Sequence, residues 1–515
     1  MKTIETKLIS VLQEYFGYSE FRDTQKDIML SVLSGKDTLA VMPTGGGKSL
    51  CYQVPSLILD GLTLVISPLI ALMQDQVSQL GKMNIPSLFL NSSLDWETYK
   101  LNMNLVRSGK VKLLYCAPET LATERVQSLL SSVKVSLIAI DEAHCISEWG
   151  HDFRPEYRQI KTFRTSFPDA VLLALTATAT KQVRKDITKS LAMRDPTEFV
   201  SSFDRENIFF EVISKAGTGG QKKAEAHLCS FIKEHKNESG IVYCFSRKSA
   251  DAIAALLQSK RISAVSYHAG LSDKERAQNQ EDFLSGKIKI IAATVAFGMG
   301  INKADVRFVI HFDLPKSIEQ YYQEIGRAGR DGKPARAILY YSHGDTHKLE
   351  FFLREKSERE KEKARMKMYD MVDYAECASC RRKVLLNYFG DEIREAHEQC
   401  CDYCSCGEDD LVDITIPAQK FLSCVVKTGE KYGATYLIDI LQGSRQKRIL
   451  ENKHNTLSVW GIGKDLTKEQ WYDVSRILLT QGYMKKTEDY SVLSLTREAK
   501  EALAQKHPFY AREAL

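Results

Sequence analysis

Short, continuously apolar segments alternate with longer amphipathic stretches from residue 38 to about residue 200. The apolar segments are predicted strands: Thr38–Met42, Thr63–Ile66, Leu113–Cys116, Leu137–Ile140 and Val171–Leu175. A strand that is apolar at every position is buried on both faces, which is typical of parallel sheets covered by helices. The pattern therefore predicts an α/β unit built on a parallel sheet.

The same alternation restarts at residue 240 and predicts a second unit of this kind. Its predicted strands are Gly240–Phe245, Ala264–Tyr267, Ile288–Ala292, Val306–His311 and Ala337–Tyr341. The join between the units is expected near Ser201–Arg205, and the glycine-rich Lys215–Gln221 is expected to form a loop just inside the second unit.

The pattern changes after residue 345. The segment His347–Tyr374 has helical spacing and dense charge, which usually indicates a solvated helix face. A cysteine cluster follows it. The C-terminal segment then ends in two predicted strands, Tyr483–Lys486 and Tyr490–Leu495, with Glu488–Asp489 as their turn. Two short strands after several helices are compatible with a winged helix.

Composition is that of an ordinary globular protein. Of the 515 residues, 43% are hydrophobic and 27% charged, and a formal net charge of +5 does not by itself indicate a nucleic-acid partner. Because the N-terminus lacks a signal-like apolar stretch and no run of about 18 apolar residues occurs, we expect no membrane span. The expected location is the cytoplasm, on the nucleoid if the source is bacterial.

A phosphate-binding loop is predicted between the first apolar strand and an amphipathic segment. Its residues are Thr44, Gly45, Gly46, Gly47, Lys48 and Ser49. The glycines let backbone N–H groups approach the phosphates of ATP, Lys48 reaches the β and γ oxygens, and Ser49 ligates Mg²⁺. The first glycine of the usual pattern falls at Met42, so the loop is a relaxed version. A plain glycine-rich turn is the alternative, which the position after a buried strand disfavours.

Two acidic residues, Asp141 and Glu142, follow the predicted strand Leu137–Ile140. A carboxylate at the end of a strand beside the phosphate-loop strand can hold Mg²⁺, directly or through water, and Asp141 is the predicted partner. Glu142 is predicted to polarise the attacking water. An ordinary acidic helix start is the alternative.

A pair of arginines lies in the second unit, within Gln323-Glu-Ile-Gly-Arg327-Ala-Gly-Arg330. Arg327 and Arg330 are about one helical turn apart, so both can face one γ-phosphate across a cleft and stabilise its charge in the transition state. The alternative is a pair of surface arginines.

An aromatic and basic segment follows Asp-Glu-Ala-His144. Its candidate DNA-binding residues are Trp149, His151, Phe153 and Arg154. Single-strand sites combine rings that stack on bases with cations that meet phosphates, and each stacked base contributes about 1–3 kcal/mol. Joined to Glu142 and His144, the loop is predicted to sense DNA and report to the ATP site. The alternative is that Trp149 and Phe153 are core residues.

Six of the 12 cysteines fall between Cys377 and Cys406. One cysteine, then a helix, then Cys-x-x-Cys is the spacing of a closed structural zinc site, and a reducing compartment favours metal over disulfides. The predicted ligands are Cys380, Cys400, Cys401 and Cys404. Since two of these are adjacent, Cys377 stays open as an alternative to Cys400, with Cys406 as a further spare. Further on, the basic stretch Gly443–Arg448 suits phosphate contacts, with Arg445 as the candidate, or is a solvated helix end.

The phosphate loop, the acidic pair and the arginine motif occur in the order found in superfamily 2 helicases. Four further segments resemble that superfamily: Ser67–Asp75, Tyr115–Glu119, Leu175–Thr180 and Ala293–Asn302. The segments Cys145–Tyr157 and Phe16–Gln25 narrow the resemblance to the RecQ family.

The resemblance implies an α/β fold with two RecA-like parallel-sheet lobes, followed by a helical zinc-binding domain and a winged-helix (RQC) domain. The expected boundaries are 1–204, 205–345, 346–408 and 409–515. The implied activity is that of a 3′-to-5′ ATP-dependent DNA helicase that uses ATP, Mg²⁺ and Zn²⁺ in recombination, repair and replication restart. The implied form is a short one, without the further HRDC domain of many relatives.

The resemblance also assigns single residues. Gln25 is expected to read the adenine edge, with Arg22 in support. Arg330 resembles the family's arginine finger, with Gln323 and Arg327 as its neighbours at the γ-phosphate. Thr176 and Thr178 fall in the segment that links the ATP state to the grip on DNA.

The expected partners are single-stranded and duplex DNA, together with single-strand-binding protein and other repair proteins, and the chain is expected to act as a monomer. Two alternatives stay open: an RNA-directed or non-unwinding translocase of superfamily 2, and a non-catalytic DNA-binding scaffold.

Overall fold

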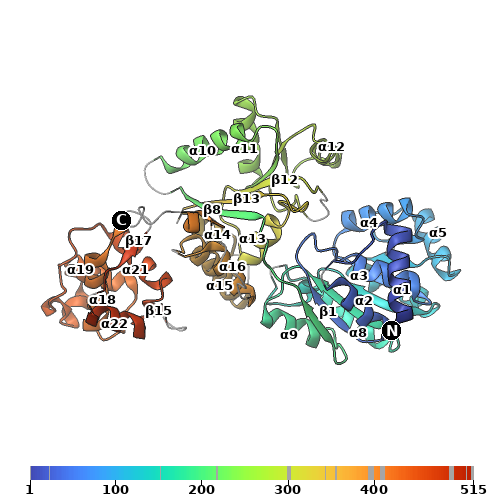
Figure 1. Cartoon of the computed structure of the whole chain (residues 1–515), viewed down its shortest axis with the longest axis horizontal. Helices are drawn as coiled ribbons and strands as arrows, with labels where there is room; N and C mark the ends of the chain where they lie inside the picture. Colours follow the sequence, from blue (N-terminus) through green and yellow to red (C-terminus); the bar gives the residue numbers. More distant parts are fainter. Residues whose placement is uncertain are drawn as a thin grey trace. The chain divides into compact units, whose positions relative to one another are not determined.

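The computed structural model of the chain describes residues 2–22, 24–150, 152–215, 219–298, 303–342, 344–353, 357–377, 379–391, 399–405, 412–486, 492–505 and 507–511. It forms two compact units (Figure 1). The first consists of Met1–Ile208, Ile213–Met371 and Leu386–Glu392, and the second of Phe209–Val212, Val372–Leu385 and Ile393–Leu515.

The first lobe is built on a seven-stranded parallel sheet with the order β3-β4-β2-β5-β6-β1-β7. Its strands are β1 Thr38–Val41, β2 Leu62–Ile66, β3 Ser87–Leu90, β4 Leu113–Cys116, β5 Val135–Ile140, β6 Val171–Thr176 and β7 Thr197–Val200. The helices around it are α1 Lys2–Val11, α2 Gln25–Leu33, α3 Leu50–Ile58, α4 Ile70–Lys82, α5 Trp96–Arg107, α6 Pro118–Leu121, α7 Glu124–Ser131, α8 Gln159–Thr165 and α9 Lys181–Ser190.

The register of this sheet brings the functional loops to one edge. Val41 pairs with Thr176, and Ile140 pairs with Ile66, so β1, β2, β5 and β6 end side by side. Loops that follow the carboxyl ends of parallel strands share that edge, where α/β proteins bind ligands. The phosphate loop after β1, the acidic pair after β5 and the segment after β6 therefore meet.

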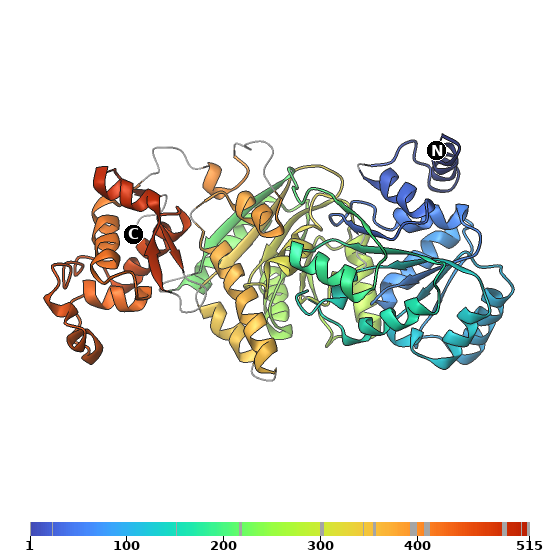
Figure 2. The ribbon, with the colours of Figure 1, turned by 90° about the horizontal axis from the view of Figure 1, so that it is seen from below.

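The second lobe repeats the architecture of a sheet with helices around it (green to yellow in Figure 2). Its sheet has six strands in the order β10-β11-β9-β12-β13-β8. Its strands are β8 Ile208–Ser214, β9 Ser239–Tyr243, β10 Ala264–Tyr267, β11 Ile290–Ala293, β12 Val306–His311 and β13 Ala335–Tyr341. Its helices are α10 Gly220–Glu234, α11 Arg247–Ser259, α12 Asp273–Leu284 and α13 Ile318–Ile325. Helices α14 Gly344–Leu353, α15 Glu358–Ala375 and α16 Arg381–Phe389 come next along the chain.

The C-terminal part of the second unit packs helices around the fully buried Trp471. The helices are α18 Thr415–Lys427, α19 Ala434–Leu441, α20 Lys447–Glu451, α21 Lys468–Thr480 and α22 Arg497–Gln505, and the short α17 Asp402–Ser405 precedes them. Two antiparallel pairs complete the unit, β14 Val412–Asp413 with β17 Tyr510–Ala511 and β15 Met484–Lys486 with β16 Leu493–Leu495. Helices followed by the β15–β16 pair confirm the expected winged helix. The predicted turn at Glu488–Asp489 lies outside the described residues.

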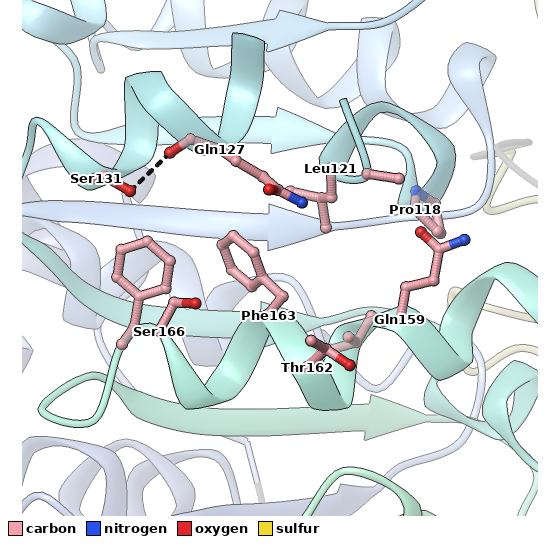
Figure 3. A pocket seen from close by; sticks show the side chains of 11 residues that line it. Pro118, Leu121, Gln127, Ser131, Gln159, Thr162, Phe163 and Ser166 are labelled. Atoms are coloured by element: carbon pink, nitrogen blue, oxygen red, sulfur yellow. Dashed lines mark hydrogen bonds between the residues drawn. The ribbon is translucent and has the colours of Figure 1, made fainter. Parts of the chain in front are cut away.

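A cavity of about 340 Å³ opens in the first lobe between α6, α7 and α8 (Figure 3). Phe163 and Phe167 pack against each other in its wall, with ring centroids 4.8 Å apart, and Ser131 Oγ donates to the carbonyl oxygen of Gln127. None of the residues that line the cavity is charged or belongs to the predicted phosphate site. This cavity is therefore separate from the predicted nucleotide site. In the described part of the chain, no helix is long and apolar enough to cross a membrane.

Candidate active site

The phosphate loop runs from Met42 to Ser49, between β1 and α3. Gly45 and Gly47 have left-handed backbone angles, with φ of 86° and 77°. A Cβ atom on Gly47 would lie 2.2 Å from Gln25 Nε2. Both the backbone conformation and the space around it therefore require glycine at this position.

Gln25 joins the start of α2 to this loop. Its Nε2 donates to the carbonyl oxygens of Gly46 and Gly47 at 3.1 and 3.3 Å, and its Oε1 accepts from the backbone N–H of Arg22 at 2.9 Å. The side chain is buried. Arg22 thus orients Gln25 through its main chain, and the predicted adenine and phosphate positions adjoin.

We expect Gly47→Ala to weaken nucleotide binding by at least about tenfold, because the new methyl group must displace Gln25 and strain the loop. Titration with a fluorescent ATP analogue measures the effect. The matched control is Gly35→Ala, which also has a left-handed backbone (φ 84°) but has open space around the added Cβ. It should keep wild-type nucleotide affinity. Equal losses in both variants would mean that backbone strain alone, rather than the contact with Gln25, is responsible.

One ammonium group and two carboxylates meet at the carboxyl edge of the sheet. Lys48 Nζ donates to the carbonyl oxygen of Met42 at 3.3 Å. Burial lowers the pKa of Lys48, and the nearby Glu142 and Asp141 oppose this shift. Burial and the neighbouring Glu142 raise the pKa of Asp141 to about 7, although Lys48 opposes the shift. A divalent cation would stabilise the ionised form of Asp141, so the carboxylate and the Ser49 hydroxyl fit Mg²⁺, whose preferred ligands are oxygens.

Glu142 is held in an unusual backbone conformation. Its φ of 48° lies in the left-handed region that few residues other than glycine adopt. Its N–H donates to Asp141 Oδ1 at 3.0 Å, and Tyr157 donates its hydroxyl proton to the carbonyl oxygen of Asp141 at 3.1 Å. The Asp141 carboxylate is therefore positioned by a main-chain contact at a strained turn.

A row of side chains leads from Glu142 to the second lobe. Glu142 Oε2 lies 3.3 Å from His144 Nδ1, which lies 2.8 Å from Thr176 Oγ1. The backbone N–H of Thr178 donates to the same hydroxyl at 3.2 Å. Across the lobes, Gln323 Nε2 donates to Thr178 Oγ1 at 3.5 Å. The acidic pair and the arginine motif are thus connected through adjacent contacts.

The two arginines of the motif take different positions. Arg330 lies over the phosphate loop, where a Cβ atom on Gly45 would be 3.5 Å from Arg330 Cγ. Burial, together with the neighbouring Arg327 and Arg205, lowers the pKa of Arg330 to about 10. Arg327 is buried and hydrogen-bonds through Nη1 to the carbonyl oxygen of Gly298. Three clustered cations beside a phosphate loop suit a polyanionic ligand.

Arg205, in the connection between the lobes, contacts both of them. Its guanidinium donates to the carbonyl oxygen of Thr44 at 3.4 Å and to those of Gly326, Ala328 and Gly329 at 3.3, 2.9 and 3.3 Å. No pattern in the sequence indicated this role, because a single arginine outside any motif has no characteristic spacing.

The aromatic loop after His144 exposes its tryptophan. Trp149 is 40% exposed, and Phe153 is half-buried with Arg158 5.0 Å above its ring. Arg154 pairs with Asp152 at 3.0 Å and donates to the carbonyl oxygen of Pro68. His151 lies outside the described residues. Trp149 is therefore not a fully buried core residue, which was the alternative prediction.

The cysteine cluster is compact. The Sγ atoms of Cys380, Cys400, Cys401 and Cys404 all lie within 4.8 Å of one another. The Cys380–Cys400 and Cys400–Cys404 distances are 3.5 and 3.9 Å, close to the edge of about 3.8 Å that four Zn–S bonds of about 2.3 Å would give a tetrahedron. Four thiols in this arrangement fit Zn²⁺. Cys377 lies apart from the cluster and accepts a hydrogen bond from Arg381 Nη1 at 3.3 Å. Cys406 is outside the described residues.

Arg381 holds the cysteine cluster to the rest of the second unit. It pairs with Asp402 at 3.0 Å and donates to the carbonyl oxygens of Tyr374 and Cys377. Asp402 in turn accepts from the N–H of Val212 at 3.0 Å.

Arg445 is exposed in the loop before α20. The Trp460 indole N–H donates to the carbonyl oxygen of Ser444 at 3.2 Å, which fixes the neighbouring backbone.

Comparison with known proteins gives four consecutive family matches. They are the DEAD/DEAH box helicase over residues 22–187, the helicase conserved C-terminal domain over 223–332, RecQ zinc-binding over 343–405 and the RQC domain over 408–515. Over 503 residues, the chain is 45% identical to the ATP-dependent DNA helicase RecQ of Pasteurella multocida, covering 97% of this chain and 78% of the relative. It is 46% identical to the protein of the same name from Haemophilus influenzae, covering 97% and 80%.

Among solved structures, the Mycobacterium smegmatis helicase Lhr bound to ssDNA and AMP-PNP has a TM-score of 0.55 at 16% identity. The match covers 96% of this chain and 61% of that one. At this identity the likeness concerns the fold alone.

Proposed function

Because the chain belongs to the RecQ family of ATP-dependent DNA helicases, we propose that it moves 3′ to 5′ along one DNA strand and separates the duplex ahead of it. The enzyme uses ATP, Mg²⁺ and Zn²⁺ and acts on DNA. The observation that best supports a motor is the row of contacts from Glu142 through His144 and Thr176 to Thr178 and Gln323. Through this row of contacts, a change at the phosphates in the first lobe can shift Gln323 in the second lobe.

In the proposed cycle, ATP enters the phosphate loop with its γ-phosphate between Lys48 and Arg330. Asp141 would hold Mg²⁺, which would neutralise charge on the phosphates, and Glu142 would polarise the water that attacks the γ-phosphate. Arg330 stabilises the charge that develops during transfer, and Gln323 and Arg327 support it. Once phosphate leaves, the negative charge that held Arg330 is gone and the lobes can separate.

DNA contacts are proposed in two regions. The aromatic loop with Trp149, His151, Phe153 and Arg154 would hold single-stranded DNA, and its link to His144 would report occupancy to the ATP site. Arg445 would meet duplex phosphates. The zinc site would stabilise the cysteine-rich module. We further propose the four domains 1–204, 205–345, 346–408 and 409–515.

The cellular setting is also a proposal. The enzyme would act on branched and duplex DNA in recombination, repair and replication restart, and would contact single-strand-binding protein and other repair proteins. It would work as a monomer in the cytoplasm, associated with the nucleoid. The support is the similarity to the bacterial relatives.

We expect Trp149→Ala to reduce the DNA-stimulated rate of ATP hydrolysis by about tenfold or more, because one stacked ring contributes about 1–3 kcal/mol and the same loop adjoins His144. A phosphate-release assay with and without an oligodeoxythymidine measures the effect. Trp96→Ala is the matched control, since Trp96 is 50% exposed on the same lobe and has a cation, Arg125, over its ring, as Trp149 has Lys363. It should leave stimulation unchanged.

If DNA does not stimulate the wild type at all, the helicase proposal fails and a scaffold becomes the better explanation. Strand displacement on matched DNA and RNA duplexes separates the remaining alternative: efficient unwinding of RNA alone would indicate an RNA-directed enzyme.

A further inference from the structure

Helix α15 places two lysines, one helical turn apart, against the aromatic loop. Lys363 Nζ lies 4.4 Å from the centre of the Trp149 ring and 2.8 Å from Glu148. Lys367 Nζ donates to the carbonyl oxygen of Trp149 at 2.6 Å. The sequence predicted a solvated charged helix here. Instead, the side chains of these two lysines are only 15% and 17% exposed.

Lys367 has a second partner in the other lobe. Its Nζ lies 3.2 Å from Glu319 Oε1, and the Glu319 side chain is 4% exposed. Glu319 belongs to the first turn of α13, the helix that contains Gln323 and leads into Arg327 and Arg330 (α13 and α15 in Figure 1). One ammonium group therefore contacts both the loop predicted to hold DNA and the helix that carries the arginine motif.

Burial makes this contact sensitive to small movements. A buried charge is costly unless its partners stay in place. Burial lowers the pKa of Lys367, and Glu319 opposes this shift. The pKa of Tyr388 is raised by burial and also by Glu319, which puts a further polar group at the same carboxylate. If DNA moves the Trp149 backbone, the Lys367 ammonium either moves with it or loses its hydrogen bond to the Trp149 carbonyl oxygen. Either change alters the contact between Lys367 and Glu319.

We propose that Lys367 is a positioning residue that transmits DNA occupancy of the aromatic loop to α13, and so to the arginines at the nucleotide. The inference rests on the proposed function, because it concerns DNA stimulation of ATP hydrolysis. It is a route between lobes separate from the row through His144 and Thr178. Lys363 has a different part, since it covers the ring face and not the backbone.

The test uses the full chain and compares Lys367→Met, which keeps the aliphatic stem, with Lys367→Arg, which keeps the charge and the donors. Lys361→Met is the matched control, because Lys361 lies on the same helix and pairs with the exposed Glu358. Three quantities are measured: hydrolysis without DNA, hydrolysis with saturating oligodeoxythymidine, and oligonucleotide affinity by fluorescence anisotropy.

We expect Lys367→Met to keep unstimulated hydrolysis and DNA affinity within about twofold of wild type while stimulation falls about tenfold, within the range typical of coupled sites. Lys367→Arg should keep most of the stimulation, and Lys361→Met all of it. Glu319→Gln should reproduce the loss, and the double variant should lose no more than Lys367→Met alone, since both changes break one contact.

Two results would overturn the inference. One is normal stimulation in Lys367→Met; the other is a loss explained entirely by weaker DNA binding. These outcomes concern only the variants, whereas failure of the proposed function would appear in the wild type as the absence of any DNA stimulation, and the inference would then fall with it. If Lys367→Met does not fold, Glu319→Gln decides the matter by the same three measurements.

Discussion

Replacing Glu142 with glutamine is expected to slow ATP hydrolysis by about a thousandfold at saturating ATP and DNA. The amide has nearly the shape of the carboxylate but cannot polarise or deprotonate the attacking water, and groups in this role contribute about 10²- to 10⁴-fold. Nucleotide affinity should stay near wild type, because Lys48, the glycine loop and Asp141 are unchanged. Single-turnover hydrolysis and nucleotide titration together measure the two effects.

The control for this variant is Glu124→Gln, an exposed carboxylate at the start of α7 in the same lobe. It should hydrolyse ATP at the wild-type rate. Hydrolysis by Glu142→Gln within about tenfold of wild type would assign the water-polarising role to another group. A large fall in nucleotide affinity would instead indicate that Glu142 organises the loop rather than the water.

The second large effect is expected at the cysteine cluster. Cys401 is fully buried, and exchanging it for serine removes one thiolate from the predicted zinc site. Structural zinc binds with about 10–16 kcal/mol in small domains, and this free energy stabilises the fold. We expect Cys401→Ser to lose its zinc and to lower the melting temperature of the second unit by about 10 °C or more. Metal analysis and thermal unfolding measure these changes.

Cys377 supplies the matched control for the zinc prediction and also decides the fourth ligand. It is buried within the same module, yet its Sγ faces Arg381 rather than the cluster. Cys377→Ser should therefore keep a full equivalent of zinc, whereas Cys400→Ser should lose it. The reverse outcome would make Cys377 the ligand and contradict the arrangement described above.

The predicted strands agree with the central strands of both sheets because burial on both faces leaves a continuous apolar run. Three strands of these two sheets were not predicted. In the first lobe these are the edge strands β3, Ser87–Leu90, and β7, Thr197–Val200, whose side chains are partly exposed and mixed in polarity. In the second lobe β8, also at an edge, contains Glu211 among apolar residues. An edge strand is shielded on one side only, so its pattern is weaker.

The motifs that follow central strands could be located from sequence, since the strand order puts their loops at one edge. The contacts made by single residues could not. The contacts of the two lysines of α15 depend on tertiary packing against a segment that lies more than 200 residues away in the sequence. Residue type alone does not distinguish a lysine that contacts a tryptophan from one in water.

Arg205 ties the connection between the two lobes to the predicted nucleotide site. Ser201, at the start of the connection, donates its N–H to the carbonyl oxygen of Val41, the last residue of β1, and four residues later Arg205 contacts Thr44. We therefore expect a rotation between the lobes to turn about this connection, close to the phosphate loop. In such a rotation, atoms far from the connection move farther than atoms beside it. A small displacement beside the phosphate loop can thus become a larger displacement at the outer rim of the second lobe. The size of that lobe then sets how far its rim moves for a given change at the nucleotide.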